Sequence, residues 1–416
     1  VARIIKQQQQ NGALIMDYSG HGIEYQISHE GVLRITDFAT FNHKNLPLWI
    51  TAACDIMPFD GSIPTIGEAA VLNPNGGSFA FYGTTRTVYV SYNRVLNAAY
   101  VKYVLGKTEG RYNTIGEAQR LAKIEMIETG QDPTINKLQY ALLGDPAVRL
   151  HLPTCQVVID SINGVAVGGD VKPVLKAGAI VRVVGHVEGQ DQFKGIVNLM
   201  VRDSEEEITC RMNEESEVDK AFVFKDRVQT LFQGADSVRA GRFALTFAVP
   251  KDMNYSSGSG LMNLYAVDAE RHLIGHGACD DFMVGGSETI VNDSIGPSLF
   301  CYLNTPEFEN GDKMNPTPLF VAELKDMNGI NVSGAGIGHD MELVIDGNAA
   351  TTYRLNDYFR FDFGSYTKGS LFFNLPELAP GPHKLSFRAW DVFNNSSTTE
   401  LRFEVASGLT PKLRYI

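Results

Sequence analysis

Residues 13–22 read Ala-Leu-Ile-Met-Asp-Tyr-Ser-Gly-His-Gly, an apolar run that ends in a histidine between two glycines. Residues 47–54, Pro-Leu-Trp-Ile-Thr-Ala-Ala-Cys, form a second apolar run that ends in a cysteine, and residues 77–82 form a third. None of the three shows the alternation of apolar and polar residues that marks a strand with one face in water. Continuous apolar strands separated by helical segments are typical of a parallel sheet covered on both faces. The pattern therefore predicts an α/β domain.

The helical segments between these runs carry start signals. Two of them begin alike, with Thr65-Ile66-Gly67-Glu68-Ala69 and Thr114-Ile115-Gly116-Glu117-Ala118. Both match the capping box, in which a Thr hydroxyl and a Glu carboxylate bind the first N–H groups of a helix. We interpret the repeat as shared capping chemistry rather than a functional motif. A longer helix is predicted over residues 92–105, and a last strand over residues 147–152.

The pattern changes at Cys155, where short strands separated by turn residues replace the longer helices. Such spacing predicts a β-sandwich over residues 154–286, closed by a linker at Gly285-Gly286-Ser287. Residues 290–405 alternate clearly, and the domain over residues 287–408 is predicted to be an immunoglobulin-like sandwich. Because 416 residues exceed one hydrophobic core, we expect three domains and a tail. Their predicted bounds are 1–153, 154–286, 287–408 and 409–416.

Composition excludes several classes of function. The net charge of −12 repels a phosphate backbone, and the sequence holds no basic stripe with interleaved aromatic residues, so nucleic-acid binding is disfavoured. No apolar run reaches the roughly 18 residues that a membrane span requires. The five cysteines are widely spaced without a Cys-x-x-Cys pair, which indicates neither a zinc site nor a redox dithiol. We assign no metal ligands and no cofactor, and leave structural calcium open.

His21 and Cys54 stand just beyond the carboxyl ends of two consecutive predicted strands, where open α/β sheets bind ligands. A thiol with an ordinary pKa of about 8.5 is mostly protonated at neutral pH, so a nucleophilic cysteine needs a partner such as an imidazole. Acyl transfer also needs N–H donors facing the oxyanion. Gly22 has no Cβ atom to obstruct that approach, so its N–H and that of Cys54 are the natural donors. From the pair alone, an ordinary turn and an inert core cysteine remain the alternative.

Five blocks in this region resemble the gingipain family of cysteine peptidases. They are Asp17-Tyr18-Ser19-Gly20-His21-Gly22, Trp49-Ile50-Thr51-Ala52-Ala53-Cys54, Thr65-Ile66-Gly67-Glu68-Ala69, Gly76-Gly77-Ser78-Phe79-Ala80-Phe81-Tyr82-Gly83 and Leu143-Gly144-Asp145-Pro146-Ala147. Five blocks in the same order are far more specific than any one of them. The resemblance implies a caspase-like α/β fold over approximately residues 11–152.

The resemblance also implies roles for single residues. In gingipains the His of the Gly-His-Gly turn is the general base, and the Cys that ends the next strand is the nucleophile. These roles correspond to His21 and Cys54, with the oxyanion donors on the backbones of Gly22 and Cys54. The family builds its specificity pocket after the third strand, where Arg86 and Tyr89 are the candidates for its lining.

Gingipains usually orient the His with an acidic residue on an earlier strand. Only 20 residues precede His21 here, so we expect the catalytic domain to be incomplete on its N-terminal side. Asp17 and Glu24 are poor substitutes for the missing acid.

The continuation through two β domains is similar to the gingipain-like sortases of the type IX secretion system, and the last domain is similar to an FlgD-like immunoglobulin domain. This likeness implies a peptidase at the outer membrane or outside a Gram-negative cell that removes C-terminal signal domains from secreted cargo proteins. Its partners would be that cargo, an outer-membrane secretion component and an amine of lipopolysaccharide as acceptor. Two alternatives stay open: a secreted gingipain-like endopeptidase, and a catalytically inactive surface adhesion or scaffold protein.

Overall fold

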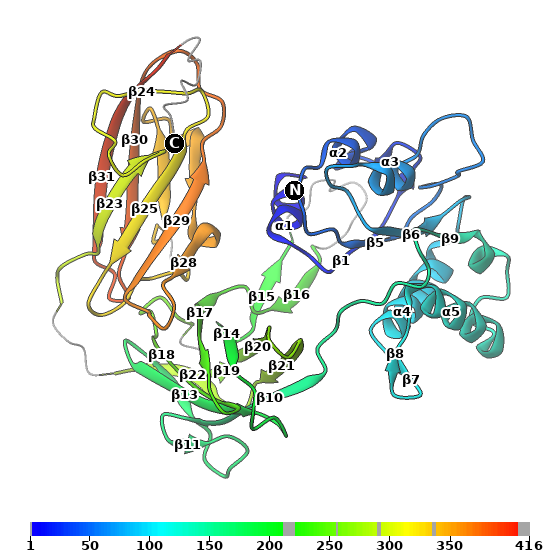
Figure 1. Ribbon diagram of the computed structural model, residues 1–416, viewed down its shortest axis with the longest axis horizontal. Helices are drawn as coiled ribbons and strands as arrows, with labels where there is room; N and C mark the ends of the chain where they lie inside the picture. The colour runs from blue at the N-terminus through cyan, green and yellow to red at the C-terminus, as the bar shows by residue number, and fades with distance from the viewer. Residues whose placement is uncertain (1, 211–220, 255–256, 289–292, 335–337, 407–416) are drawn as a thin grey trace. The chain divides into compact units, whose positions relative to one another are not determined.

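The computed structural model describes residues 2–210, 221–254, 257–288, 293–334 and 338–406. The chain divides into two units, unit 1 over Val1–Leu152 and unit 2 over Pro153–Ile416 (Figure 1). Unit 1 contains α-helices and strands, whereas the described part of unit 2 consists of strands joined by turns and short 3-10 helices. Among the described helices, none has both the length and the apolar character needed to cross a membrane.

A four-stranded sheet forms the centre of unit 1. Its order is β1 (Ile15–Ser19), β5 (Leu48–Ala52), β6 (Ala80–Thr84) and β9 (Tyr140–Leu143). β1, β5 and β6 are parallel to one another, as predicted, whereas β9 runs antiparallel to β6. Every residue of β5 and β6 is buried, which explains why the sequence of these strands does not alternate.

The predicted last strand over residues 147–152 is wrong. The final strand of the sheet is β9, which precedes the turn at Pro146, and the chain after this turn runs past the start of α5 (Ile115–Thr129). There the carbonyl oxygens of Pro146 and Val148 accept hydrogen bonds from the N–H groups of Gly116 and Ile115. These carbonyl groups cap a helix, and so are not available to a neighbouring strand.

Helices cover both faces of the sheet in unit 1 (Figure 1). On one face α4 (Val90–Val104) and α5 pack over a cluster that includes Ile50 and Tyr82. On the other face α2 (Ile35–Thr40) and α3 (Ile66–Leu72) pack over Trp49 and Phe81, and α1 (Ala2–Asn11) joins this second cluster. The shorter elements are β2 (Gly22–Ile23), β3 (Gln26–Ile27), β4 (Leu33–Arg34), β7 (Lys107–Thr108), β8 (Arg111–Tyr112) and η1 (Asn136–Gln139).

Both predicted capping boxes are confirmed. At the start of α3, the Thr65 N–H donates to the Glu68 carboxylate at 2.9 Å, and the Glu68 N–H donates back to the Thr65 hydroxyl at 3.5 Å. At the start of α5, the same two bonds join Thr114 and Glu117 at 2.7 and 3.0 Å. The repeated sequence therefore has a structural explanation at both positions.

Unit 2 begins with a long sheet that wraps a core of aliphatic and phenylalanine side chains. Its strand order is β17-β14-β20-β21-β10-β13-β18, with β11 paired to β10. A small sheet, β12-β22-β19, and a two-stranded ribbon, β15-β16, complete this region. The bounds are β10 (Cys155–Ile162), β11 (Val165–Ala166), β12 (Val174–Ala177), β13 (Ile180–Val187), β14 (Gly195–Arg202), β15 (Glu206–Thr209), β16 (Val223–Asp226), β17 (Thr230–Val238), β18 (Arg242–Ala248), β19 (Gly258–Ser259), β20 (Leu261–Asp268), β21 (Leu273–Cys279) and β22 (Met283–Ser287).

The linker predicted at Gly285-Gly286-Ser287 is wrong, because these residues end strand β22. The small size of Gly285 allows close approach: a Cβ atom there would lie 2.7 Å from the Ser257 hydroxyl oxygen and 3.0 Å from Ser257 Cα. Gly285 thus serves packing within a sheet, a role that composition alone does not distinguish from flexibility.

The last part of unit 2 is a sandwich of two sheets, β23-β25-β29-β28 and β24-β31-β30-β26-β27. Side chains of both sheets share one core, in which the rings of Phe320 and Phe387 lie 5.3 Å apart. The immunoglobulin-like assignment of the two β regions stays a prediction, and the tail at 409–416 lies outside the described residues. The bounds are β23 (Ser298–Leu303), β24 (Lys313–Met314), β25 (Leu319–Lys325), β26 (Glu342–Ile345), β27 (Thr352–Arg354), β28 (Phe359–Phe361), β29 (Lys368–Asn374), β30 (Gly381–Trp390) and β31 (Ser396–Val405), with 3-10 helices η2 (Ala349–Thr351) and η3 (Asn356–Tyr358).

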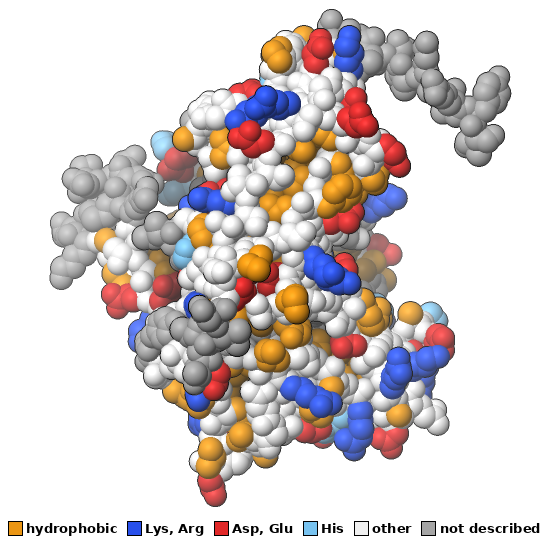
Figure 2. Space-filling model, turned by 90° about the vertical axis from the view of Figure 1, so that its left-hand side faces the viewer, with side chains coloured by type: hydrophobic (Ala, Val, Ile, Leu, Met, Phe, Trp, Pro, Cys, Tyr) orange, Lys and Arg blue, Asp and Glu red, His pale blue; other side chains and the backbone are white. Residues whose placement is uncertain are grey.

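Charged side chains of both signs are interspersed on one face of the molecule (Figure 2). Figure 2 shows acidic and basic groups next to one another on the face that it displays, with hydrophobic side chains among them. On this face, the net charge of −12 is therefore not gathered into one acidic field.

Candidate active site

His21 and Cys54 leave the sheet from neighbouring strands at the same level. In the parallel pair of β1 and β5, Ser19 lies opposite Ala52, and the same offset along the chain separates His21 from Cys54. The Gly20 N–H donates to the Ala52 carbonyl oxygen at 3.2 Å, so the pairing continues past the last residue of β1. Both residues therefore stand at the carboxyl edge of a parallel pair, where loops of such sheets form binding sites.

The turn that carries His21 is held through its backbone. The His21 carbonyl oxygen accepts two hydrogen bonds, from the Tyr18 hydroxyl at 2.8 Å and from the Ser28 N–H at 2.8 Å. The His21 side chain is exposed. The backbone of the turn is thus fixed while the imidazole faces solvent, as a base that meets a substrate requires.

Gly22 lets this turn approach the segment that carries Cys54. A Cβ atom on Gly22 would lie 2.4 Å from Ile56 Cδ1 and 2.9 Å from Ala53 Cβ. Real Cβ atoms do not approach other atoms so closely, so a larger residue would push the two segments apart. The contact brings the turn of the histidine against the loop of the cysteine.

The Gly22 N–H has the geometry expected of a free donor. Gly22 pairs with Ile27 in the antiparallel hairpin of β2 and β3. Because the adjacent pair, His21 and Ser28, uses its backbone bond, the Gly22–Ile27 pair is of the non-hydrogen-bonded kind. The N–H of Gly22 therefore points away from β3, and its assignment as an oxyanion donor stays a prediction.

The Cys54 sulfur is only partly buried and contacts the loop that follows β6. The sulfur donates to the Val88 carbonyl oxygen at 3.4 Å and accepts from the Val88 N–H at 3.5 Å. Within the described residues, no hydrogen bond joins this sulfur to the His21 ring. Catalytic hydrogen bonds are often loose without substrate and tighten when it binds, so the geometry is compatible with a nucleophile and base pair.

A tight turn follows Cys54. Asp55 has a φ of 49°, in the left-handed region that aspartate tolerates better than most residues. Its carboxylate accepts a hydrogen bond from the Thr87 hydroxyl at 2.8 Å, and its N–H donates to the Arg86 carbonyl oxygen at 3.3 Å. The Thr84 hydroxyl donates to the carbonyl oxygen before Cys54. The loop after β6 thus fixes the turn that presents the sulfur.

Arg86 and Tyr89, the predicted pocket residues, flank the part of this loop that contacts Cys54. The Arg86 guanidinium binds the Asp60 carboxylate through two hydrogen bonds, of 3.0 and 2.5 Å, and both side chains are exposed. Tyr89 is 66% exposed and its ring stands edge-on to that of Tyr92 at 6.3 Å. Both side chains are accessible to a substrate, and their role in binding one stays a prediction.

Among the described residues, no hydrogen bond or ion pair joins the carboxylate of Asp17 or of Glu24 to the His21 ring. The Asp17 carboxylate accepts hydrogen bonds from the Asn97 amide at 3.0 and 3.1 Å, and burial raises its pKa. The Glu24 carbonyl oxygen accepts from the Ile66 N–H. The pKa of Glu30, in the loop after β3, is lowered mainly by hydrogen bonds from its own N–H and from the Ser28 hydroxyl, and further by the charges of His29 and His21.

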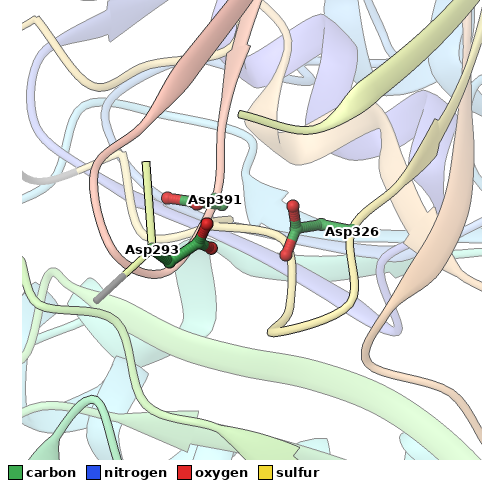
Figure 3. A group of neighbouring side chains, drawn as sticks. All are labelled: Asp293, Asp326 and Asp391. Carbon is green, nitrogen blue, oxygen red and sulfur yellow. The ribbon is translucent and has the colours of Figure 1, made fainter. Parts of the chain in front are cut away.

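Three aspartates of unit 2 form a separate group. The carboxylate oxygens of Asp293, Asp326 and Asp391 lie within 4.8 Å of one another (Figure 3). Asp391 is fully buried, and its carboxylate accepts bonds from the N–H groups of Phe393 and Asn395 at 2.9 and 2.7 Å and from the Asn395 amide at 2.8 Å. Burial raises the pKa of Asp326 and of Asp391. These bonds account for the buried carboxylate as part of a turn, and a role in holding calcium stays open.

Residues 1–151 match the model of peptidase family C25. This match covers almost all of unit 1, so unit 1 is similar to the peptidases of family C25. Among solved structures, the chain is similar to dimeric latent PorU from Porphyromonas gingivalis, at 34% sequence identity over 81% of this chain and 32% of that one, with a TM-score of 0.40. It is also similar to the Arg-specific cysteine proteinase gingipain R (RgpB), at 15% identity over 68% and 56% of the two chains, with a TM-score of 0.34.

The chain thus spans about a third of the PorU chain and 56% of the gingipain R chain. No curated protein matches its sequence. The match to family C25 covers the part of the chain that includes His21 and Cys54.

Proposed function

We propose that the protein is a cysteine peptidase in which Cys54 is the nucleophile and His21 the general base. The observation that supports this most strongly is the common level at which the two residues leave the neighbouring strands β1 and β5. Gly22 then brings the histidine turn into contact with the residues on either side of Cys54. An exposed imidazole and a partly buried thiol at one sheet edge are the groups that acyl transfer requires.

The reaction proceeds in two halves. His21 takes the thiol proton as the Cys54 sulfur attacks the scissile carbonyl carbon, and the oxyanion lies against the N–H groups of Gly22 and Cys54. His21 then protonates the leaving amine, which departs and leaves a thioester on the sulfur. Water or an acceptor amine next attacks the thioester and gives a proton to His21. The acyl group leaves as the product, and the Cys54 thiolate takes the proton back from His21. Water completes proteolysis, and an amine completes transpeptidation.

We further propose that the substrates are secreted cargo proteins with C-terminal signal domains, processed at the outer membrane or cell surface of a Gram-negative bacterium. The support is the 34% identity to PorU together with the continuation of the chain into two β regions. An outer-membrane secretion component and a lipopolysaccharide amine are the partners that this role requires.

Two variants test the chemistry. An acyloxymethyl ketone peptide should label the unaltered chain on the peptide that contains Cys54, and Cys54→Ala should lose that label. Cys279→Ala is the matched control, because Cys279 is also partly buried and burial raises the pKa of its thiol. It should keep full labelling. Absence of labelling in the unaltered chain would identify an inactive surface protein.

A second experiment tests the substrate. Cells that carry only the Cys54→Ala form should accumulate cargo that retains its C-terminal signal domain. If labelling of Cys54 succeeds and cargo is still processed at the normal rate in these cells, the protein is a secreted endopeptidase of another kind.

A further inference from the structure

The loop that contacts the Cys54 sulfur is anchored on its other side by a buried amide. Val88 binds the sulfur through its N–H and carbonyl groups, and the next residue, Tyr89, donates its N–H to Asn136 Oδ1 at 2.8 Å. Asn136 is 2% exposed and opens the 3-10 helix η1. A single side-chain hydrogen bond thus links the buried Asn136 amide to the backbone next to Val88, which contacts the sulfur.

The Asn136 side chain has little freedom to turn. Its Nδ2 group donates to Asn93 Oδ1 on α4 at 3.3 Å, and Asn93 is itself 5% exposed. Its backbone N–H donates to the Thr134 hydroxyl oxygen at 3.1 Å. Thr134 in turn donates through its N–H and hydroxyl to the Asp132 carboxylate at 3.0 and 2.7 Å, and Asp132 is 1% exposed. This connected, buried network orients the Asn136 oxygen toward Tyr89.

The earlier part of the same loop is fastened as well. The N–H and hydroxyl of Thr85 both donate to the Gln139 carbonyl oxygen, at 2.8 and 3.0 Å. The Met57 N–H donates to the Thr84 carbonyl oxygen at 2.9 Å. Residues 84–89 are therefore held between the turn of Cys54 and the segment 136–139.

We infer that Asn136 is a positioning residue for Cys54, acting through the backbone of Tyr89 and Val88. The inference rests on the proposed role of Cys54 as the nucleophile. In the thiol form the sulfur donates to the Val88 carbonyl, and in the thiolate form it accepts from the Val88 N–H. A donor held in place beforehand stabilises the thiolate without reorganisation, and Asn136 holds it by fixing the next peptide.

Several titratable or charged groups surround this part of unit 1. Their effects on a pH profile must be distinguished from the effect of Asn136. Burial is the main cause that raises the pKa of Tyr140 on β9, and the charges of Cys54, Asp17 and Asp132 raise it further. The others are His21, Asp55, Arg86 and Lys137, the last of which donates to the Asp132 carbonyl oxygen at 2.8 Å. Asn136 carries no charge, so replacing it leaves this set unchanged.

The test is the rate of alkylation of Cys54 by iodoacetamide from pH 5 to 10, read by mass spectrometry on the peptide that contains this residue. Asn136→Ala should slow alkylation at pH 7 about tenfold and move the midpoint of the profile up by about one unit. Asn113→Ala is the matched control, because Asn113 is 3% exposed in the same unit and its amide donates to the Tyr103 carbonyl oxygen at 2.9 Å. Its profile should match that of the unaltered chain.

Identical profiles for Asn136→Ala and the unaltered chain would overturn the inference, and so would an equal slowing in both variants. If Asn136→Ala does not fold, hydrogen exchange of the unaltered chain tests the inference instead. There the Tyr89 amide should exchange as slowly as the amides in the middle of α4, and exchange at the rate of an exposed loop would overturn the inference. Alkylation measures the reactivity of the thiol and does not depend on peptide cleavage. If Asn136→Ala slows alkylation but the unaltered chain cleaves no peptide, the proposed function is refuted and the role of Asn136 in positioning Cys54 is not.

Discussion

At the scale of single residues, the N-terminal helix of unit 1 is tied to the sheet by one buried glutamine. Gln9 is fully buried, and its amide nitrogen donates to the Gly77 carbonyl oxygen at 2.7 Å and to His43 Nε2 at 3.0 Å. The Trp49 indole N–H donates to the Gln9 oxygen at 3.3 Å. These contacts need a neutral His43, because a proton on Nε2 would face the donor of Gln9.

This network predicts that unit 1 loses stability in acid. Burial lowers the pKa of His43 below its ordinary 6.5, although the neighbouring Gly77 carbonyl partly offsets this. The unfolded chain therefore binds the proton more readily. The contribution of His43 to the free energy of unfolding is complete above pH 6.5 and falls as the pH drops toward the lowered pKa. Urea unfolding at pH 7 and pH 5 should show a smaller loss of stability for His43→Gln than for the unaltered chain.

His151→Gln provides the comparison, since His151 is exposed in the same unit and should leave the pH dependence unchanged. If the free energy of unfolding falls equally between pH 7 and pH 5 in His43→Gln and in the unaltered chain, the folded state does not disfavour protonation of His43.

At the scale of elements, the start of α5 shows how completely a helix end is satisfied. The N–H groups of Ile115 and Gly116 donate to the carbonyl oxygens of Val148 and Pro146, and the Glu117 N–H donates to the Thr114 hydroxyl. The first free donors of the helix are thus all paired, two by the chain after β9 and one by the cap. This pairing joins the helix to the end of the sheet.

Thr114→Ala should therefore lower the free energy of unfolding by about 1 kcal/mol, the usual value of a helix cap. Thr114→Ser should restore most of the loss, because serine keeps the hydroxyl that accepts the Glu117 N–H. Thr129→Ala, at the exposed end of the same helix, should change stability by less than about 0.5 kcal/mol. Urea titration of the three variants measures this, and equal losses at both ends of the helix would contradict the role of the cap.

At the scale of the molecule, the two β regions of unit 2 share a hydrogen-bonded aspartate. Asp252 follows β18 in the first region, and its side chain is 10% exposed. Its carboxylate accepts from the His339 ring at 2.5 Å, the Asn394 amide at 2.8 Å and the Asn331 amide at 3.1 Å, all from the second region. One carboxylate thus satisfies three donors of the neighbouring sandwich.

Removing this carboxylate should loosen unit 2. Asp252→Ala leaves three donors without their acceptor, and leaving buried hydrogen-bonding groups unsatisfied costs about 1–3 kcal/mol. Asp346→Ala removes a second Asp–His pair, with His383, but the Asp346 side chain is 46% exposed and its loss should cost no more than about 1 kcal/mol. Calorimetry of the full chain should show the larger shift for Asp252→Ala. Equal shifts would mean that Asp252 contributes nothing beyond a surface pair.

Much of unit 1 is predictable from local sequence because its signals are local. The uninterrupted apolar residues of β5 and β6 indicate burial on both faces, and the Thr-x-x-Glu pattern at Thr65 and Thr114 indicates helix starts that the structure confirms. The positions of His21 and Cys54 just after β1 and β5 follow from where the apolar runs stop. The order of the family blocks added the resemblance to gingipains, and the match of residues 1–151 to peptidase family C25 confirms that resemblance.

The contacts that shape the candidate site are a matter of tertiary structure. The antiparallel strand β9, the approach of Gly22 to Ile56 and the bond from Tyr89 to Asn136 each join segments whose sequences carry no sign of one another. Their partners are chosen by the packing of helices and loops around the finished sheet. Periodicity reports whether a residue is buried, but the identity of the residue it meets depends on long-range contacts that form only when the chain closes on itself.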